Sequence, residues 1–217
     1  LDEDSMTTQT QTRLPIHADP AVEAVISDGI TPEQSYRAGV YGLLAALLRA
    51  APDQALMNHV GALKQVDAQH GELAVAISML GLAAGSCAVE AVDDEYHALF
   101  IGLGRGELVP YGSWYQTGFL MEKPLGALRD DLAALGFVRQ EGVSEPEDHV
   151  AALCEVMAML IEGGSAIEQQ SAFFQSHIAN WLERFFADLS QARTAVFYRA
   201  VGRFGGAFTT LEKSYLL

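Results

Sequence analysis

Apolar side chains recur every three or four residues along most of this chain, from about Tyr36 to Phe208. One face near the start of the pattern carries Tyr36, Val40, Leu43, Leu44 and Leu47. This spacing is typical of amphipathic α-helices that bury one face against each other. No alternating run of strand length interrupts it. We therefore predict an all-α fold, a compact multi-helix bundle of about eight helices.

Start and stop signals divide the pattern into helices. Thr31 is a suitable N-cap and is followed by proline, which is favoured at the first helical position. Ser144 and Glu147 have the spacing of a capping box and predict a second well-defined start. Helices are expected after Thr31-Pro32-Glu33, after Pro52, over about 71–84 and 89–101, from about Ser113 to Gly136 with a restart or kink at Pro124, from Ser144 to Gly163-Gly164, and over two long segments around 167–185 and 197–211.

The ends of the pattern suggest the domain organisation. Residues 1–30 are rich in Thr, Gln and Asp without an apolar period, so we expect a flexible acidic N-terminal tail. Residues 31–217 are expected to form one all-helical domain. The polar connection at 137–143 separates two groups of helices and is the best candidate for a hinge.

The charge balance excludes some classes of partner. The chain has 28 acidic and 13 basic residues, for a formal net charge of −15. Nucleic-acid binders need basic surfaces, and anionic lipids repel an acidic one, so neither partner is expected. A cationic peptide would be attracted. The simpler explanation, that acidity only keeps the protein in solution, stays open.

Cysteine usage and hydropathy point to the cytoplasm. Cys87 and Cys154 lie in apolar helical stretches and are expected to be small buried side chains rather than a disulfide. No apolar run reaches the length of a transmembrane helix, and the first residues lack the pattern of a signal peptide. We therefore expect a cytoplasmic protein without membrane insertion.

The run Glu145–His149 places three carboxylates at a predicted helix start. Acids there complement the helix dipole, which is a sufficient structural explanation. Three acids nevertheless exceed what capping requires, and together they could accept a cation. From the helical spacing, His149 is expected at the edge of the buried face, titrating near neutral pH, with Asp148 pointing outward.

The segment Pro110–Tyr115 combines backbone constraints with aromatic side chains. Proline and glycine fix the backbone, Ser113 can cap the coming helix, and the aromatic rings offer apolar surface with polar edges. This composition suits a peptide-binding groove and suits equally a loop that packs on the core.

Other chemistries find little support. Phe173, Phe174, His177 and Trp181 are expected to form a core aromatic stripe with a hydrogen-bonded histidine, not a metal site. The glycine-rich stretch 102–106 follows a helix and lacks the Lys-Ser/Thr of a P-loop. No Gly-x-Ser-x-Gly motif is present. We do not expect an enzyme.

Three ordered stretches resemble the TorD/DmsD/NarJ family of molybdoenzyme chaperones. Glu95–Gly102 and Pro110–Tyr115 are similar to that family's E-Y-x-x-L-F and P-Y-x-S-x-Y motifs. Glu145–His149 is similar to its E-P-x-D-H motif. Phe174, His177, Trp181 and Phe197-Tyr198 resemble its C-terminal pattern. The likeness runs from about Tyr36 to Phe208.

The resemblance implies a TorD-like bundle and a non-catalytic function. Such chaperones bind the twin-arginine leader of a molybdenum enzyme and hold the apoenzyme until its cofactor is inserted, which delays export. The client would be of the dimethyl sulfoxide or trimethylamine oxide reductase type, or of the formate dehydrogenase type. The family also implies a monomer or a domain-swapped homodimer, and no cofactor apart from the weak guanine-nucleotide binding associated with some relatives.

The residues expected to bind the leader come from two of the three stretches. They are Pro110, Tyr111, Ser113, Trp114, Tyr115, Glu145, Pro146, Asp148 and His149. Three other functions remain open: a chaperone of a nitrate reductase that is not exported, a helical enzyme with Asp148 and His149 as an acid–base pair, and a dimerisation module.

Overall fold

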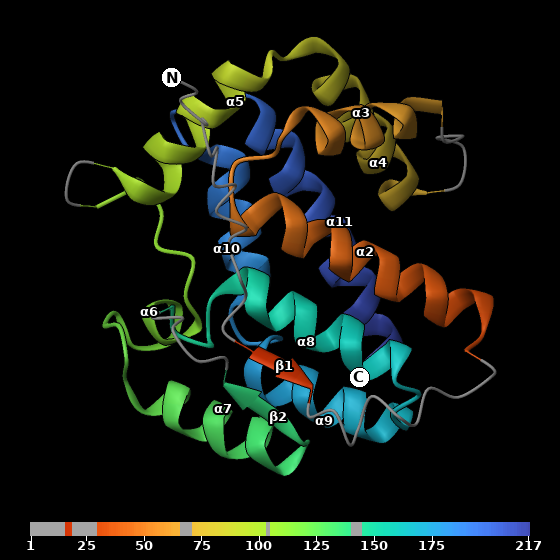
Figure 1. Cartoon of the computed structure of the whole chain (residues 1–217), viewed down its shortest axis with the longest axis vertical. Helices are drawn as coiled ribbons and strands as arrows, with labels where there is room; N and C mark the ends of the chain where they lie inside the picture. Colours follow the sequence, from red (N-terminus) through yellow and green to blue (C-terminus); the bar gives the residue numbers. More distant parts are fainter. Residues whose placement is uncertain (1–15, 19–29, 66–70, 103–104, 140–144) are drawn as a thin grey trace, which may run out of the picture.

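Helices dominate the structure, a computed structural model that describes residues 16–18, 30–65, 71–102, 105–139 and 145–217 (Figure 1). This part of the chain contains 10 α-helices, which confirms the all-α prediction. They are α2 (Pro32–Arg49), α3 (Gln54–Ala62), α4 (Glu72–Ser86), α5 (Val89–Tyr96), α6 (Gly112–Thr117), α7 (Lys123–Ala134), α8 (Val150–Glu162), α9 (Ile167–His177), α10 (Leu182–Gln191) and α11 (Phe197–Leu216). A 3₁₀ turn, η1 (Leu63–Gln65), extends α3, and a π-helical turn, η3 (His97–Ile101), extends α5.

The first described helix begins where its sequence signals place it. The Gln34 backbone N–H donates to Thr31 Oγ1 at 3.2 Å, and the Thr31 N–H donates to Gln34 Oε1 at 2.9 Å. Two backbone donors that a helix start leaves unpaired are thus satisfied reciprocally. The predicted start of α2 is confirmed.

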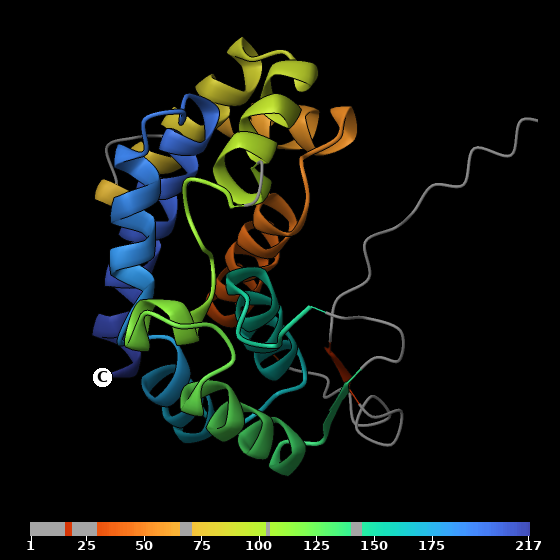
Figure 2. The same cartoon turned by 90° about the vertical axis from the view of Figure 1, so that its left-hand side faces the viewer.

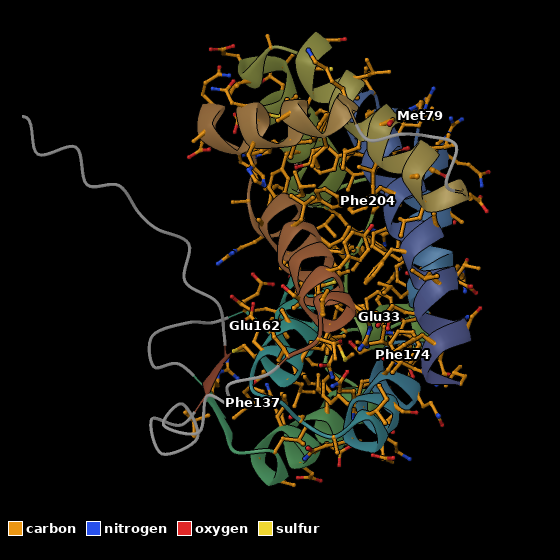
Figure 3. The ribbon with its side chains drawn as sticks, turned by 90° about the vertical axis from the view of Figure 1, so that its right-hand side faces the viewer. Glu33, Met79, Phe137, Glu162, Phe174 and Phe204 are labelled. Atoms are coloured by element: carbon orange, nitrogen blue, oxygen red, sulfur yellow. The ribbon has the colours of Figure 1, made fainter. Side chains whose placement is uncertain are left out.

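Helix α8 lies at the centre of the molecule. Of its 13 residues, 10 are buried, so it presents apolar side chains in nearly every direction. Helix α2 packs along it, while α11 packs against α10 and α4. In Figure 2, α10 and α11 form one side and α2 and α8 the middle. Phe174 and Phe204 fill the interior between α2 and the C-terminal helices (Figure 3).

A buried polar cluster joins three helices at one end of this core. Arg37 of α2 donates to both carboxylate oxygens of Glu212 of α11, at 2.7 and 2.8 Å, and to Gln170 of α9 at 2.9 Å. Tyr41 also donates to Glu212, at 2.9 Å. Both charged side chains are almost fully buried, at 2% and 1% exposure. Their pairing is therefore obligatory, because an unpaired charge in this position would be strongly destabilising.

Two predictions about the elements are corrected. The long helix expected around 167–185 is two helices, because the chain turns after His177 and α10 begins at Leu182. The turn buries Trp181, whose indole N–H donates to the His177 carbonyl at 2.7 Å. A short antiparallel sheet also exists: β1 (Ile16–Ala18) pairs with β2 (Phe137–Arg139), with Ile16 opposite Arg139.

The predicted tail and hinge are described only in part. Of residues 1–30, the structure describes Ile16–Ala18, which form β1, and Ile30. Residues 137–139 of the proposed hinge form β2, and 140–144 lie outside the described residues. The tail and the hinge therefore stay predictions.

No single helix in the described ranges combines the length and apolar character needed to cross a membrane. The required length and apolar character are met only by two helical segments taken together, Glu72–Ser86 and Val89–Ile101. The chain bends by 112° between them.

Candidate functional site

Two segments far apart in the sequence lie side by side at the start of α8. The Gly112 N–H donates to the Asp148 carbonyl and the Val150 N–H to the Pro110 carbonyl, each at 2.9 Å. Tyr111 and His149 thus form an isolated antiparallel bridge. The structure therefore brings together the two stretches from which a binding site was predicted.

Asp148 is a buried cap and does not point outward as expected. It is 3% exposed, and its Oδ2 accepts the Ser113 N–H at 2.7 Å, at the first turn of α6. Its Oδ1 and the Ser113 Oγ are buried without a hydrogen-bond partner among the described residues. The expectation failed because Asp148 lies before the helix, where the helical spacing used to orient it does not apply. Asp148 fixes the position of α6 relative to α8.

Glu147 is likewise committed to contacts within the protein. Its buried carboxylate accepts hydrogen bonds from the side chains of Arg129 of α7, at 2.9 Å, and Arg139 of β2, at 3.0 Å. The capping box predicted for Ser144 and Glu147 is wrong, because α8 begins only at Val150. Ser144 itself lies outside the described residues. The bridge to Tyr111 holds His149 itself in an extended conformation, so helix α8 starts after it.

His149 is the N-cap of α8 and is neutral at physiological pH. Its Nδ1 accepts the Ala151 N–H at 3.2 Å, and its ring meets the Tyr111 ring edge-on at 5.1 Å between centroids. Burial lowers the pKa of His149 from 6.5 to about 4. The expectation that it titrates near neutral pH is therefore wrong.

Glu145 is the exposed carboxylate of the run. It accepts a hydrogen bond from the Tyr111 hydroxyl. Burial of the ring, followed by this hydrogen bond and the charge of Glu145, raises the pKa of Tyr111 far above 10. Because Glu147 and Asp148 are buried, the charge that the run offers to a ligand is that of Glu145. Pro146, which lies between Glu145 and Glu147, is half-buried.

The aromatic side chains of α6 lie partly in the core and partly at the surface. Tyr115 packs on Trp181 at 5.5 Å and donates to Asp188 at 3.1 Å. Both Trp114 and Tyr115 are half-buried. The two interpretations of this segment, core packing and exposed groove, thus each describe part of it.

Two arginines that the sequence did not single out cover these rings. The Arg105 guanidinium lies 4.7 Å from the centre of the Trp114 ring, and that of Arg184 lies 5.6 Å from Tyr115. Both border a pocket of about 410 Å³ beside α6. Such stacking depends on tertiary packing and has no signature in local sequence.

The third stretch of the resemblance contains His177 and Trp181 and packs against the start of α6. His177 Nε2 lies 2.7 Å from Asp131 Oδ2, and Trp181 is bonded to the His177 carbonyl, which confirms the aromatic stripe with a hydrogen-bonded histidine. Trp181 also packs under Gly112, where an added Cβ would lie 3.1 Å from its indole nitrogen. A side chain at 112 would be in tight contact with the Trp181 indole, so α6 approaches the core closely at this glycine.

Glu95, in the first stretch, is structural. Its carboxylate accepts the backbone N–H groups of Val196 at 2.7 Å, Phe197 at 3.0 Å and Tyr198 at 2.8 Å. It thereby caps α11, whose first turn has no side-chain cap of its own. Of the two cysteines, Cys154 is buried as expected and Cys87 is partly buried.

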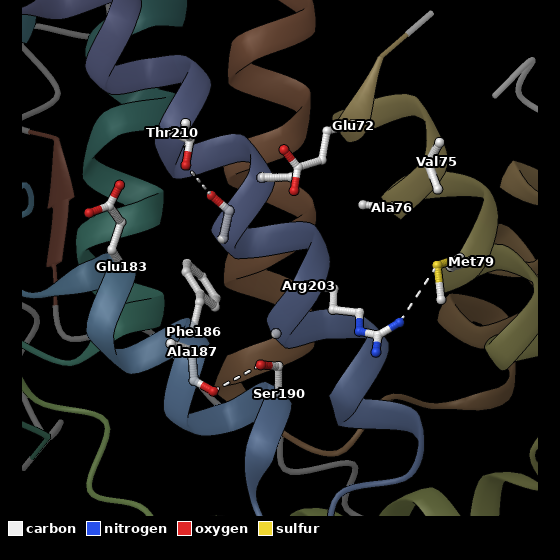
Figure 4. Close-up of a pocket in the computed structure, with 13 residues that line it drawn as sticks. Glu72, Val75, Ala76, Met79, Glu183, Phe186, Ala187, Ser190, Arg203 and Thr210 are labelled. Atoms are coloured by element: carbon white, nitrogen blue, oxygen red, sulfur yellow. Dashed lines mark hydrogen bonds between the residues drawn. The ribbon is translucent and has the colours of Figure 1, made fainter. Parts of the chain in front are cut away.

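A separate groove of about 500 Å³ lies between α4, α10 and α11 (Figure 4). Val75, Met79 and Phe186 line its apolar part, and Arg203 lies over Met79. Within the described ranges, no cluster of His, Cys, Asp or Glu has an arrangement that could hold a metal ion.

Several known chaperones are similar to this chain in sequence. The chaperone protein TorD of Vibrio parahaemolyticus is 29% identical over 152 residues, covering 64% of this chain and 66% of that protein. TorD of Vibrio cholerae is 31% identical over 129 residues, covering 54% and 59%. The probable Tat proofreading chaperone DmsD of Haemophilus influenzae is 30% identical over 112 residues, covering 51% and 54%. The chain thus matches less than two thirds of the length of these relatives.

A crystal structure shows the same fold. It is assigned as a redox enzyme maturation protein from Archaeoglobus fulgidus and superposes with a TM-score of 0.56, at 19% identity, over 82% of this chain and 93% of that one. The family model described as the nitrate reductase delta subunit matches residues 62–187, more than half of the chain and including both segments of the site. The chain belongs to the nitrate reductase delta subunit family.

Proposed function

We propose that the protein is a cytoplasmic chaperone for the maturation of a molybdoenzyme. It binds the twin-arginine leader of its client at the surface formed by Pro110–Tyr115 and Glu145–His149. It holds the apoenzyme until the cofactor is inserted, and then releases it for export. The names of the relatives, TorD and DmsD chaperones among them, support this function.

The observation that carries the proposal is the bridge between Tyr111 and His149. It places the exposed carboxylate of Glu145 directly beside the partly exposed aromatic residues of α6. A twin-arginine leader has a cationic start and an apolar segment. A single surface therefore offers both an anion and apolar contact area to one short peptide.

The residues of the site divide into those that contact the leader and those that hold the geometry. Glu145 pairs with a leader guanidinium, while Tyr111, Trp114 and Tyr115 supply the apolar contact. Ser113, Asp148 and His149 use their backbone or side-chain groups within the protein. Together with Pro110 and Pro146, they position the contacting residues.

The expected affinity suits a partner that must be released. Burying about 500 Å² of apolar leader surface yields roughly 12 kcal/mol at about 25 cal/mol per Å². Association and ordering cost about 4 kcal/mol or more, which leaves an affinity in the micromolar range.

Calorimetry with a synthetic twin-arginine leader tests the function. We expect micromolar binding that falls about tenfold when both arginines are replaced by glutamine, because the charge pair is lost. Glu145→Gln should cause a similar loss for the arginine peptide and almost none for the glutamine peptide. Equal affinities of the wild-type protein for both peptides would contradict leader recognition.

The family description favours a nitrate reductase as the alternative client. In this alternative the enzyme is not exported. Both proposals predict a chaperone and differ only in the partner. Co-purification from the native cell, followed by mass spectrometry of the partner, separates them. The acid–base alternative is weaker, because Asp148 Oδ2 and His149 Nδ1 each already accept a backbone N–H.

A further inference from the structure

The turn between α6 and α7 exposes three consecutive large apolar side chains. Phe119 is 67% exposed, Leu120 47% and Met121 70%. The turn lies at the outer edge of the view in Figure 1. Single exposed apolar residues are normal on protein surfaces, but a contiguous group typically marks a contact surface. We call residues 119–121 the apolar turn.

Local hydrogen bonds fix the start of the apolar turn. The Gly118 N–H donates to the Trp114 carbonyl at 2.8 Å and closes α6, with Gly118 in the left-handed conformation at φ 82°. The Phe119 N–H donates to Thr117 Oγ1 at 3.2 Å, while that hydroxyl donates to the Ser113 carbonyl at 2.8 Å. The apolar side chains are therefore presented on an ordered backbone, which lowers the entropic cost of binding.

Met121 adds a second, independent observation. Its φ of 59° makes it the one non-glycine residue with positive φ among the described residues. Glycine or asparagine adopts this conformation at lower cost than methionine. The fold thus keeps a strained apolar residue that is 70% exposed. Strained backbone of this kind clusters at ligand-binding sites, which makes the turn a candidate contact surface.

The apolar turn continues the proposed leader site. Helix α6 has 6 residues between Gly112 and Thr117, so it separates Glu145 and Tyr111 at one end from the turn at the other by about 9 Å. Three extended peptide residues cover that length. Arg105 already covers one face of Trp114, which limits the apolar area available on α6 itself. The turn supplies the missing apolar area.

We propose that Phe119, Leu120 and Met121 dock the apolar segment of the client leader. This inference rests on the proposed function and assigns a second half to its site. Glu145 receives the cationic start, and the apolar segment that follows crosses α6 to reach the turn. A twin-arginine leader fits this surface by complementarity. The surface has an exposed carboxylate at one end of α6 and an exposed apolar cluster at the other, and the leader has a cationic start followed by an apolar segment.

The test measures leader binding and thermal stability together on the full chain. Met121→Gly removes the side chain and accepts the left-handed backbone, so we expect an equal or higher melting temperature with about tenfold weaker leader binding. Phe119→Ser should weaken binding to a similar extent. Met79→Ser is the matched control, because Met79 is an exposed methionine, at 37%, in the groove of Figure 4 away from α6. It should bind the leader as the wild type does.

A second peptide separates docking from an indirect effect. It keeps both arginines and replaces the apolar segment with serine and glycine. Wild type, Met121→Gly and Phe119→Ser should bind this peptide equally weakly. If the two variants lose affinity for it to the same extent as for the natural leader, the turn acts only through the fold and the inference is overturned.

The inference and the proposed function fail in different ways. If the wild type binds the leader and both turn variants bind it equally well, the apolar turn has no docking role and the function stands. If the wild type binds no twin-arginine peptide, the proposed function itself is overturned.

Discussion

The Asp148 carboxylate accepts the backbone N–H of Ser113 at 2.7 Å, across 35 residues of sequence. This bond joins the two motifs of the site in a way that neither motif specifies alone. Asp148 is buried and its second oxygen lacks a partner among the described residues. Asp148 therefore holds α6 in place.

Asp148→Ala should lower both stability and leader affinity. It leaves the Ser113 N–H buried and unpaired, which costs about 1–3 kcal/mol in the free energy of unfolding. Leader affinity should fall because α6 loses its anchor. Urea denaturation and calorimetry check the two effects. Glu145→Gln is the control, since that carboxylate is exposed and should change affinity but not stability; the opposite pattern would contradict the division of roles.

His149 should make the fold less stable at mildly acidic pH. Its folded pKa of about 4 lies below the 6.5 of an exposed histidine, so between these values the unfolded chain binds more protons. Stability is therefore fully present above pH 6.5 and falls as the pH drops towards 4. The full effect is on the order of 3 kcal/mol.

The variant His149→Asn isolates this effect. Asparagine is a good N-cap and offers an oxygen to the Ala151 N–H, but it does not titrate. Denaturation at several pH values between 4 and 7 should show a smaller pH slope for the variant than for the wild type. Identical slopes would mean that His149 is protonated as readily in the folded protein as in the unfolded chain.

The buried pair of Arg37 and Glu212 should be one of the most sensitive points of the fold. Glu212→Leu leaves the guanidinium buried without its partner, and we expect a loss of about 3–5 kcal/mol. Glu162, at the exposed end of α8, provides the control: Glu162→Leu should change stability by less than about 0.5 kcal/mol. Thermal unfolding measures both, and similar small losses would show that Arg37 finds other partners.

Substitution of alanine for two adjacent glycines of α11 should change stability in opposite directions. A Cβ at Gly205 would lie 2.2 Å from the Phe186 ring, whereas at Gly206 the nearest atom is 3.9 Å away. Gly205→Ala should therefore destabilise the protein by about 1–3 kcal/mol through overpacking. Gly206→Ala should stabilise it by up to about 1 kcal/mol, because alanine is the better helix former. Denaturant midpoints compare the pair, and equal effects would contradict the close approach of α10 and α11.

The sequence anticipated features that depend on short-range spacing. The three-to-four spacing of apolar residues predicted the helices. Thr31 and Gln34 cap the start of α2 through hydrogen bonds between residues close in sequence. The same three-to-four spacing of apolar residues continues across the turn after His177, because the residues before and after this turn face the same core. Apolar periodicity records burial and not the continuity of a helix, so two helices were predicted as one.

The Glu145–His149 run shows where local reasoning stops. The sequence by itself determined that carboxylates, proline and histidine gather before a buried helix, and the ordered motifs marked this place as a site. Only the tertiary structure decided what each residue does. Because of the bridge to Tyr111, helix α8 begins only at Val150. Arginines of α7 and β2 donate hydrogen bonds to Glu147, and the backbone of α6 donates one to Asp148. Glu145 is left at the surface, because burial and pairing depend on segments that approach only when the chain folds.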